Sequence, residues 1–383
     1  MTIDFARSPR STLGIEWELA LVDPVSRSLA NTAPPILAEL ERRWPPSPGA
    51  PQATSELLQN TVELVSAPHR RVGEAIGELR LLAADLLDQA RAHGVRVIGT
   101  GSHPFSRWED QLITPGERYG RFVERTQWWG RNMLIWGVHV HVGIDRRERV
   151  IPTLHTLLTY QPVFQALSAS SPFWAGEATG YRSNRTLMFQ QLPSAGLPAH
   201  VESWEDFERV IEDLTRTGVI AEPTEARWDV RPAPRWGTIE VRFCDGSSSL
   251  ETLGALAALT QCLVEDCARR LDRGETLPLL PPWFARENKW RAARFGLDAE
   301  VIYDAAGSQA RLRDRVSVLL DRLAPVAVDL GCVDELEQVA RIVESGTSAD
   351  RQLETYSRLG GTLDALRAVV DSEADAFERS VRG

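Results

Sequence analysis

The sequence predicts an α+β protein whose strands lie in the first two thirds of the chain and whose last third is helical. Four separate stretches alternate apolar and polar residues with a period of two, which is typical of strands with one buried face. Between these stretches, and beyond residue 249, apolar residues recur at helical spacing instead. Strands and helices in this order indicate the α+β class.

The clearest strand covers residues 135–143, where valine and histidine alternate strictly. His139 and His141 therefore lie on one face, and valines fill the other. Helices do not favour β-branched residues at every second position, whereas a half-buried pleated surface does. Taken alone, the histidine pair fits either a partly solvated sheet face or a metal site.

The other strands also place polar residues on one face and apolar residues on the other. Residues 11–23 place Glu16 and Glu18 on the face opposite their apolar neighbours, and two like charges this close repel unless water or a cation lies between them. Residues 52–68 form two short extended pieces, the second of which carries Glu63. In the strand that ends near residue 245, Glu240 and Arg242 share a face. Each strand alone fits a solvated antiparallel face.

Helical spacing and capping signals define the helices. A further short strand is expected at 95–100. The expected helices are 34–43, 72–93, 116–131, 151–170, 203–217, 250–272, 285–295, 311–329, 333–345 and 349–378.

Composition excludes several functions. The 383 residues carry a net charge of -10 without a basic cluster, so on electrostatic grounds we expect no nucleic-acid partner. Lys289 is the single lysine, so phosphate binding cannot use a P-loop lysine and must use arginine, metal or backbone amides. No apolar run suits a signal peptide or a membrane span, so we expect a cytoplasmic protein without a membrane partner. The four cysteines show no Cys-x-x-Cys spacing, which favours buried free thiols.

The polar strand faces concentrate carboxylate, imidazole and guanidinium groups instead of the Thr, Lys, Gln and Ser of an ordinary solvated face. Gathered in one sheet, they would form an acidic concavity that a divalent cation would neutralise most simply. Oxygen-rich sites with one imidazole suit Mg²⁺ or Mn²⁺ better than Zn²⁺. Hard cations beside arginines indicate phosphoryl transfer. The residues concerned are Glu16, Glu18, Glu56, Glu63, Glu240, His139 and Arg242.

As an ordered set, the motifs resemble the carboxylate-amine ligases of the type-2 glutamate-cysteine ligase family, within the glutamine-synthetase-like superfamily. The matching stretches span roughly residues 12–290. They are Gly14-Ile-Glu-Trp-Glu18, Glu63-Leu-Val-Ser-Ala-Pro68, Gly137-Val-His-Val-His-Val-Gly143, Ser183-Asn-Arg185 with Leu192-Pro193, and Trp228-Asp-Val-Arg-Pro232 running into Gly237-Thr-Ile-Glu-Val-Arg242.

The resemblance implies a curved, mainly antiparallel sheet whose concave face binds ATP, several Mg²⁺ (or Mn²⁺) ions and an amino acid. Arg242 would steady the transferring γ-phosphate, and Arg182, Arg185 and Arg231 would contact phosphate or substrate. Arg242, Arg185 and Arg231 would thus be the catalytic residues. The implied metal ligands are Glu16, Glu18, Glu63, His139 and Glu240, with Glu56 a weaker candidate because it rests only on its spacing before Glu63.

In the resembled family, ATP activates an acid as an acyl phosphate, and an amine then displaces phosphate to form an amide. The small-molecule partners would be an amino acid, with glutamate the leading candidate, and an amine that the motifs do not specify. The chain at 1–383 would form one ligase catalytic domain, with a sheet-bearing core at about 10–248 and a mainly helical portion at about 249–383. Whether it forms a homodimer stays open.

Other interpretations stay open as well. Most arginines are surface salt-bridge partners, and these could be too. His-x-His on a strand also occurs in metal-dependent amide hydrolases, although their parallel barrel needs further His ligands and a late Asp. A ligase fold with weak or altered activity is the remaining alternative.

Overall fold

A central antiparallel sheet organises the molecule, which we describe from a computed structural model for residues 2–383. Within these residues the sheet has seven strands in the order β10-β11-β5-β1-β3-β2, with β4 pairing β1 at the end of the latter strand. All of its strand pairs are antiparallel. The strands are β1 (Leu13–Val22), β2 (Gln52–Ser55), β3 (Thr61–Val65), β4 (Arg96–Ile98), β5 (Gly137–Gly143), β10 (Val230–Ala233) and β11 (Thr238–Asp245).

The register of this sheet brings the polar faces together. Glu16 on β1 stands opposite His139 on β5, Glu18 opposite Glu63 on β3, and His141 opposite Glu240 on β11. Because side chains alternate between faces, a shift of one residue would bury these charges on the core side. The alternation read from the sequence therefore fixes which residues share the charged face, and the register places them beside one another.

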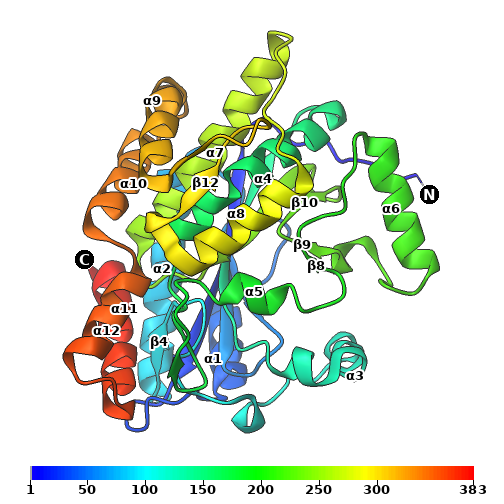
Figure 1. The fold of residues 1–383 in the computed structure, drawn as a ribbon. Coiled ribbons are helices and arrows are strands. Elements are labelled where there is room, and N and C mark those ends of the chain that lie inside the picture. Colours follow the sequence, from blue (N-terminus) through cyan, green and yellow to red (C-terminus); the bar gives the residue numbers. More distant parts are fainter. Residues whose placement is uncertain (1) are drawn as a thin grey trace.

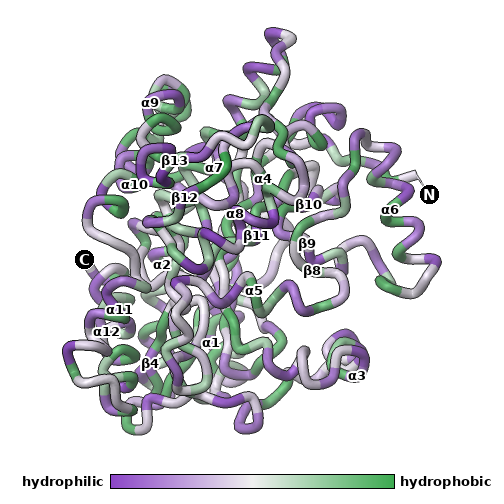
Figure 2. Tube along the Cα trace, in the orientation of Figure 1, coloured by the Kyte–Doolittle hydropathy of each residue, from purple (hydrophilic) through white to green (hydrophobic). Residues whose placement is uncertain are grey.

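Helices cover the other, apolar face of the sheet. The helices α2 (Val72–Ala92), α4 (Val150–Leu167) and α7 (Leu250–Asp272) pack against β1, β11 and β5 respectively. Trp17, Val140 and Val241 are fully buried beneath them, and the ring of Trp17 lies 5.3 Å from that of Phe377 on α12 (Leu363–Arg382). Figure 2 shows long hydrophobic segments in α4 and α7, whereas α6 (Trp204–Arg216) is largely hydrophilic. The burial of this face supplies most of the driving force for folding.

The α+β class and the helical C-terminal region are confirmed. Figure 1 shows the C-terminal helices along one side of the molecule and α3 and α6 on the other. The remaining helices are α1 (Ala33–Arg43), α3 (Glu117–Arg131), α5 (Arg185–Phe189), α8 (Pro282–Phe295), α9 (Leu312–Leu330), α10 (Val333–Ser345) and α11 (Ser348–Arg358). The short strands are β6 (Phe173–Trp174), β7 (Glu177–Ala178), β8 (Ala195–Gly196), β9 (Arg227–Trp228), β12 (Glu300–Ile302) and β13 (Gln309–Arg311).

One predicted element is wrong. The single helix expected at 349–378 is two helices, α11 and α12, separated at Gly360 and Gly361. Both glycines have left-handed backbone angles, with φ values of 81° and 67°, which end α11 and turn the chain. The helical spacing of apolar residues continues on both sides of Gly360 and Gly361, which is why the sequence pattern predicted a single helix. The pair β12 and β13 was also not expected in this helical region.

The four cysteines are free and buried, as the sequence predicts. No helix within residues 2–383 is both long enough and apolar enough to cross a membrane.

Candidate active site

A pocket of about 290 Å³ opens on the charged face of the sheet. Carboxylates and an imidazole from β1, β3 and β5 line it together with arginines, two of which are on β10 and β11 of the same sheet. Ligand pockets in proteins commonly have volumes of this order. The predicted residues on its lining are Glu16, Glu18, Glu56, Glu63, His139, Arg185, Arg231 and Arg242.

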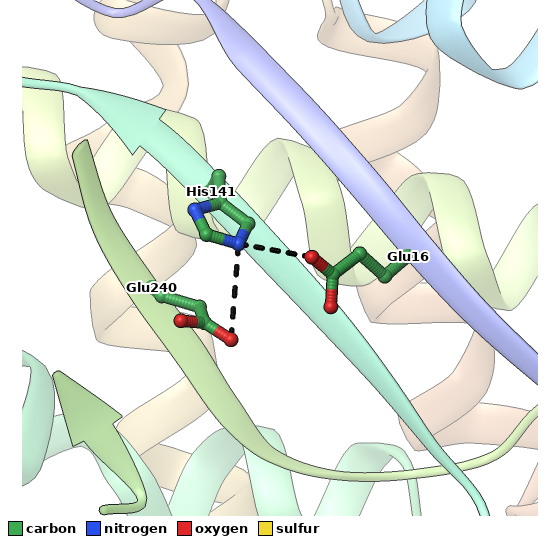
Figure 3. Close-up of side chains that lie close together, drawn as sticks. All are labelled: Glu16, His141 and Glu240. Atoms are coloured by element: carbon green, nitrogen blue, oxygen red, sulfur yellow. Dashed lines mark hydrogen bonds and ion pairs between the residues drawn. The ribbon is translucent and has the colours of Figure 1, made fainter. Parts of the chain in front are cut away.

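Glu16 lies at the centre of the charged face, between two histidines. His139 Nδ1 is 2.8 Å from one Glu16 oxygen, and His141 Nε2 is 3.2 Å from the other. His141 Nε2 also lies 3.7 Å from a Glu240 oxygen, and Figure 3 shows His141 between the two carboxylates. Glu16, His141 and Glu240 offer ligand atoms within 4.8 Å of one another, a spacing that suits one cation. The sequence placed His141 on this face without including it among the metal ligands.

Two further groups could hold cations. Glu16, Glu63 and His139 form one, and Glu18, Glu56 and Glu63 form the other, again with ligand atoms within 4.8 Å. Glu56, the weakest candidate in the sequence, therefore lies with the others although it is beyond the end of β2. Oxygen donors with one or two imidazoles match the chemistry of Mg²⁺ and Mn²⁺.

The carboxylates are strongly coupled in charge. Burial, then Glu16, Glu56 and Glu18, hold the pKa of Glu63 well above its usual range. Burial also raises the pKa of Glu18 to about 7, although Arg185 opposes this, and burial raises the pKa of Glu56. Folding thus concentrates negative charge that no protein cation fully neutralises, and a divalent ion would relieve it.

Glu16 behaves in the opposite way. Burial alone would raise its pKa, but hydrogen bonds with His139 and His141 outweigh burial and lower the pKa well below the usual range. Burial, then Arg242, lowers the pKa of His139 to about 4, so this imidazole is neutral at neutral pH. Arg185 lies 3.3 Å from His139 Nε2 and can only donate, so the ring proton is on Nδ1, facing Glu16. A cation at Nε2 would therefore displace the Arg185 contact.

Glu240 is fully buried and pairs with two arginines. Arg231 Nε is 2.5 Å from one oxygen, and Arg242 pairs with the other. Burial opposes the ionised form, but Arg231 and Arg242 outweigh it and hold the pKa of Glu240 well below its usual range. In return, Glu240 raises the pKa of Arg242 against the effect of burial. Glu240 therefore orients two predicted phosphate-binding guanidinium groups and also faces His141.

Asp245 is a residue that the sequence interpretation missed. It is fully buried and accepts hydrogen bonds from Ser171 Oγ at 2.6 Å and Ser183 Oγ at 2.8 Å. Ser171 Oγ in turn accepts from the backbone N–H of Asn184 and of Arg185, at 2.8 and 3.2 Å. This network fixes the start of α5 and hence Arg185.

Simple alternation would place Asp245 on the apolar face with Val241 and Phe243, where a charge needs partners, and this conflict was the available signal. A bulge between Val241 and Cys244 resolves it by reversing the alternation.

A second buried ion pair, between Lys289 and Asp229, supports the backbone near Arg231 and Arg242. Lys289 Nζ lies 2.7 Å from Asp229 Oδ2, and both side chains are 2% exposed. Gln161 Nε2 donates to the same oxygen at 3.0 Å. The backbone carbonyl of Asp229 accepts from the N–H of Arg242 at 2.9 Å. The single lysine therefore holds the strand end that leads to Arg231.

The residues that line the pocket differ in part from those predicted from the sequence. Arg182 does not line this pocket and lies 3.4 Å from Asp350, so its contact with phosphate or substrate stays a prediction. Conversely, Arg118, Tyr119 and Phe122 on α3 line the pocket together with Arg227, and none of them was singled out. An amphipathic helix gives no signal that one of its faces borders a site, whereas Arg227 adjoins the recognised motif at 228–232.

Comparison with known proteins gives consistent matches. The model of the family described as glutamate-cysteine ligase family 2 matches residues 12–372. A relative from Clavibacter sepedonicus, provisionally named glutamate–cysteine ligase 2, is 54% identical over 95% of this chain and 94% of its own. A relative of the same name from Mycobacterium tuberculosis (strain ATCC 25177 / H37Ra) is 51% identical over 97% of this chain and 96% of its own.

Solved structures with this fold are more distant in sequence. A glutamate–cysteine ligase from Francisella tularensis in complex with AMP has a TM-score of 0.70 at 17% identity, over 99% of this chain and 94% of that one. A bifunctional glutathione synthetase from Pasteurella multocida has a TM-score of 0.68 at 14% identity, over 96% of this chain and 53% of that one. At these identities the similarity concerns the fold.

Replacing Glu63 with glutamine is expected to raise the melting temperature of the metal-free protein at about pH 8 and to reduce the further rise on adding Mg²⁺. The raised pKa of Glu63 means that folding disfavours its charged form. Wild-type stability should therefore fall as the pH rises above the unfolded pKa of about 4.3, and the variant should escape this loss. Thermal melts with EDTA or Mg²⁺ across this range test it.

The exposed Glu177 provides the control, since Glu177→Gln should change neither quantity. A lower metal-free melting temperature for Glu63→Gln than for wild type at neutral pH would contradict the charge-crowding argument.

Proposed function

Because this chain belongs to glutamate-cysteine ligase family 2, we propose that it uses ATP to join the carboxylate of a small amino acid, glutamate first, to an amine. The observation that supports the reaction is the pocket itself, which four carboxylates and the imidazole of His139 line together with a group of arginines. A carboxylate is a poor electrophile, and phosphorylation gives it a good leaving group. The amine then forms the amide bond as phosphate leaves.

Different residues of the site would bind the metal ions and the phosphates. Glu16, Glu18, Glu56, Glu63, Glu240 and the two histidines would hold Mg²⁺ or Mn²⁺, which supplies charge neutralisation for the phosphates. Arg242, fixed by Glu240, presents its guanidinium to the γ-phosphate, and Arg231 and Arg185 flank it. Arginine suits this role because its planar fork matches phosphate oxygens. No lysine lines the pocket, which agrees with phosphate binding without a P-loop.

The hydrolase alternative has little structural support. A metal-dependent amidohydrolase uses a parallel barrel, whereas the seven-stranded sheet is antiparallel and ends at β10 and β2 without closing.

Incubation with glutamate, Mg-ATP and hydroxylamine is expected to yield γ-glutamyl hydroxamate and ADP, because hydroxylamine is small enough to trap an acyl phosphate whatever the natural amine is. The iron-complex colour of the hydroxamate and a coupled assay for ADP measure the two products. Hydroxamate without cysteine-dependent ADP release would keep the ligase reaction and remove cysteine as the acceptor. Neither product with any acid tried would contradict the proposal.

Arg242→Lys should lower the hydroxamate-forming kcat by about 100-fold and leave the melting temperature near that of wild type. Lysine keeps the charge beside Glu240 but loses the planar fork. The neighbouring Val241→Ala is the matched control, since its side chain is fully buried. It should lower the free energy of unfolding by about 2 kcal/mol and largely keep kcat. Equal effects of the two variants on both quantities would count against a role for Arg242 in phosphate binding.

A further inference from the structure

Gly137 begins β5 at a position where the backbone itself does not require glycine. Its φ angle is not left-handed, so an ordinary residue could adopt the same conformation. A glycine in a strand generally lowers stability, because it has no side chain to pack and more conformational freedom to lose. Gly137 shares the charged face of the sheet with His139. The reason for a glycine here must therefore lie in the groups that surround it.

The guanidinium of Arg185 fills the space that a side chain at position 137 would need. A Cβ atom on Gly137 would lie 2.1 Å from Arg185 Nη2, 2.4 Å from Cζ and 2.6 Å from Nε. Cβ atoms in proteins essentially never come within 3.0 Å of a non-bonded heavy atom. Any other residue at this position would therefore push the guanidinium away, and a strand glycine is typical of such a close approach.

Other groups hold the Arg185 guanidinium on its remaining sides. Nη1 donates to the backbone carbonyl of Arg242 at 2.8 Å, and Nη2 lies 3.3 Å from His139 Nε2. The guanidinium carbon lies 5.7 Å from the centroid of the Phe189 ring. Arg185 is only 2% exposed. The bare Cα of Gly137 thus completes a close-fitting site for this guanidinium.

The protein leaves part of the Arg185 guanidinium without a partner. Within residues 2–383, Arg185 makes no ion pair with a carboxylate, and its Nε is buried without a hydrogen-bond acceptor. A buried charge without a counter-charge and a donor without an acceptor both cost free energy. Arg185 also lines the active-site pocket. An anionic oxygen of a bound substrate would satisfy both the charge and the donor.

We propose that Gly137 is a positioning residue, whose missing side chain lets the Arg185 guanidinium lie against β5 and bind an anionic oxygen of the substrate. This inference rests on the proposed ligase reaction. Gly137 also donates its backbone N–H to Glu18, one of the candidate metal ligands. Position 137 therefore contacts both the carboxylates and the arginines of the site. Only the contact with Arg185 depends on glycine, because every residue except proline has the backbone N–H.

Gly137→Ala is expected to lower the hydroxamate-forming kcat by about 100-fold, because a displacement of about 1 Å in a site can cost this much. The melting temperature should stay within about 2 °C of wild type, since the methyl group meets the end of a flexible side chain that can swing away. A raised KM for Mg-ATP would assign the bound oxygen to phosphate, and a raised KM for glutamate would assign it to the carboxylate. Unchanged kcat and KM would overturn the inference.

Gly143→Ala is the matched control, because Gly143 lies on the same face at the other end of β5. Its Cβ would meet groups outside the pocket, 2.4 Å from the carbonyl oxygen of Pro9 and 2.6 Å from Thr12 Oγ1. This variant should lower the melting temperature more than Gly137→Ala does and largely keep kcat below its melting transition. If both variants lose stability and kcat to the same extent, Gly137 is an ordinary structural glycine and the inference is wrong.

A double-mutant cycle tests whether Gly137 acts through Arg185. Once Arg185→Ala has removed the guanidinium, the added methyl group has room. Gly137→Ala should then change the remaining kcat by less than about twofold, which is the usual limit for sites without interaction. A further loss as large as that in the wild-type background would contradict the inference.

Crystal structures of wild type and Gly137→Ala test the same point without turnover. In the variant, the Arg185 guanidinium should leave the carbonyl of Arg242 while β5 keeps its register. A guanidinium that stays in place would refute the inference even if the variant were inactive. Absence of hydroxamate with the wild type would refute the proposed function instead, so the two failures can be told apart.

Discussion

The crowding of carboxylates on one face of the sheet is the electrostatic constraint on which the site depends. Glu18, Glu56 and Glu63 offer oxygens within 4.8 Å of one another, in positions where burial raises the pKa of each. Such an arrangement lowers stability unless cations enter it. The apolar face of the same strands is buried under α2, α4 and α7, and this burial offsets the stability lost to the crowded carboxylates. Function and folding therefore use opposite faces of the same strands.

The positive groups need equally firm support, since a mobile arginine would collapse onto these carboxylates. Glu240 holds Arg231 and Arg242, and the Asp245 network with Ser171 and Ser183 fixes the backbone at Arg185. These supports are themselves buried and hydrogen-bonded, which makes them rigid. The site is thus built in two layers, with charged groups that face the pocket and buried acids that orient them.

The sequence predicted the part of this arrangement that follows a simple period. Alternation placed Glu16, Glu18 and Glu63 on one face, and the structure confirms the strands and their faces. It could not give the distance between strands, so His141 was not recognised as a neighbour of both Glu16 and Glu240. Local patterns also carry no information on contacts across the fold, which is why Phe122 and Asp245 were missed. The prediction of a single helix at 349–378 failed for a different reason, because the apolar spacing continues past the glycine pair that ends α11.

The burial of Lys289 against Asp229 has a chemical consequence for the rest of the surface. As the single lysine of the chain is 2% exposed, positive charge around the active-site pocket comes from guanidinium groups, which stay protonated and are poor nucleophiles. A protein that activates acids in an open pocket would modify its own lysines wherever an amine reached the activated carbonyl. In this chain the one lysine side chain is buried in an ion pair, so an acid activated by the proposed reaction would meet no exposed lysine amine on the protein's own surface.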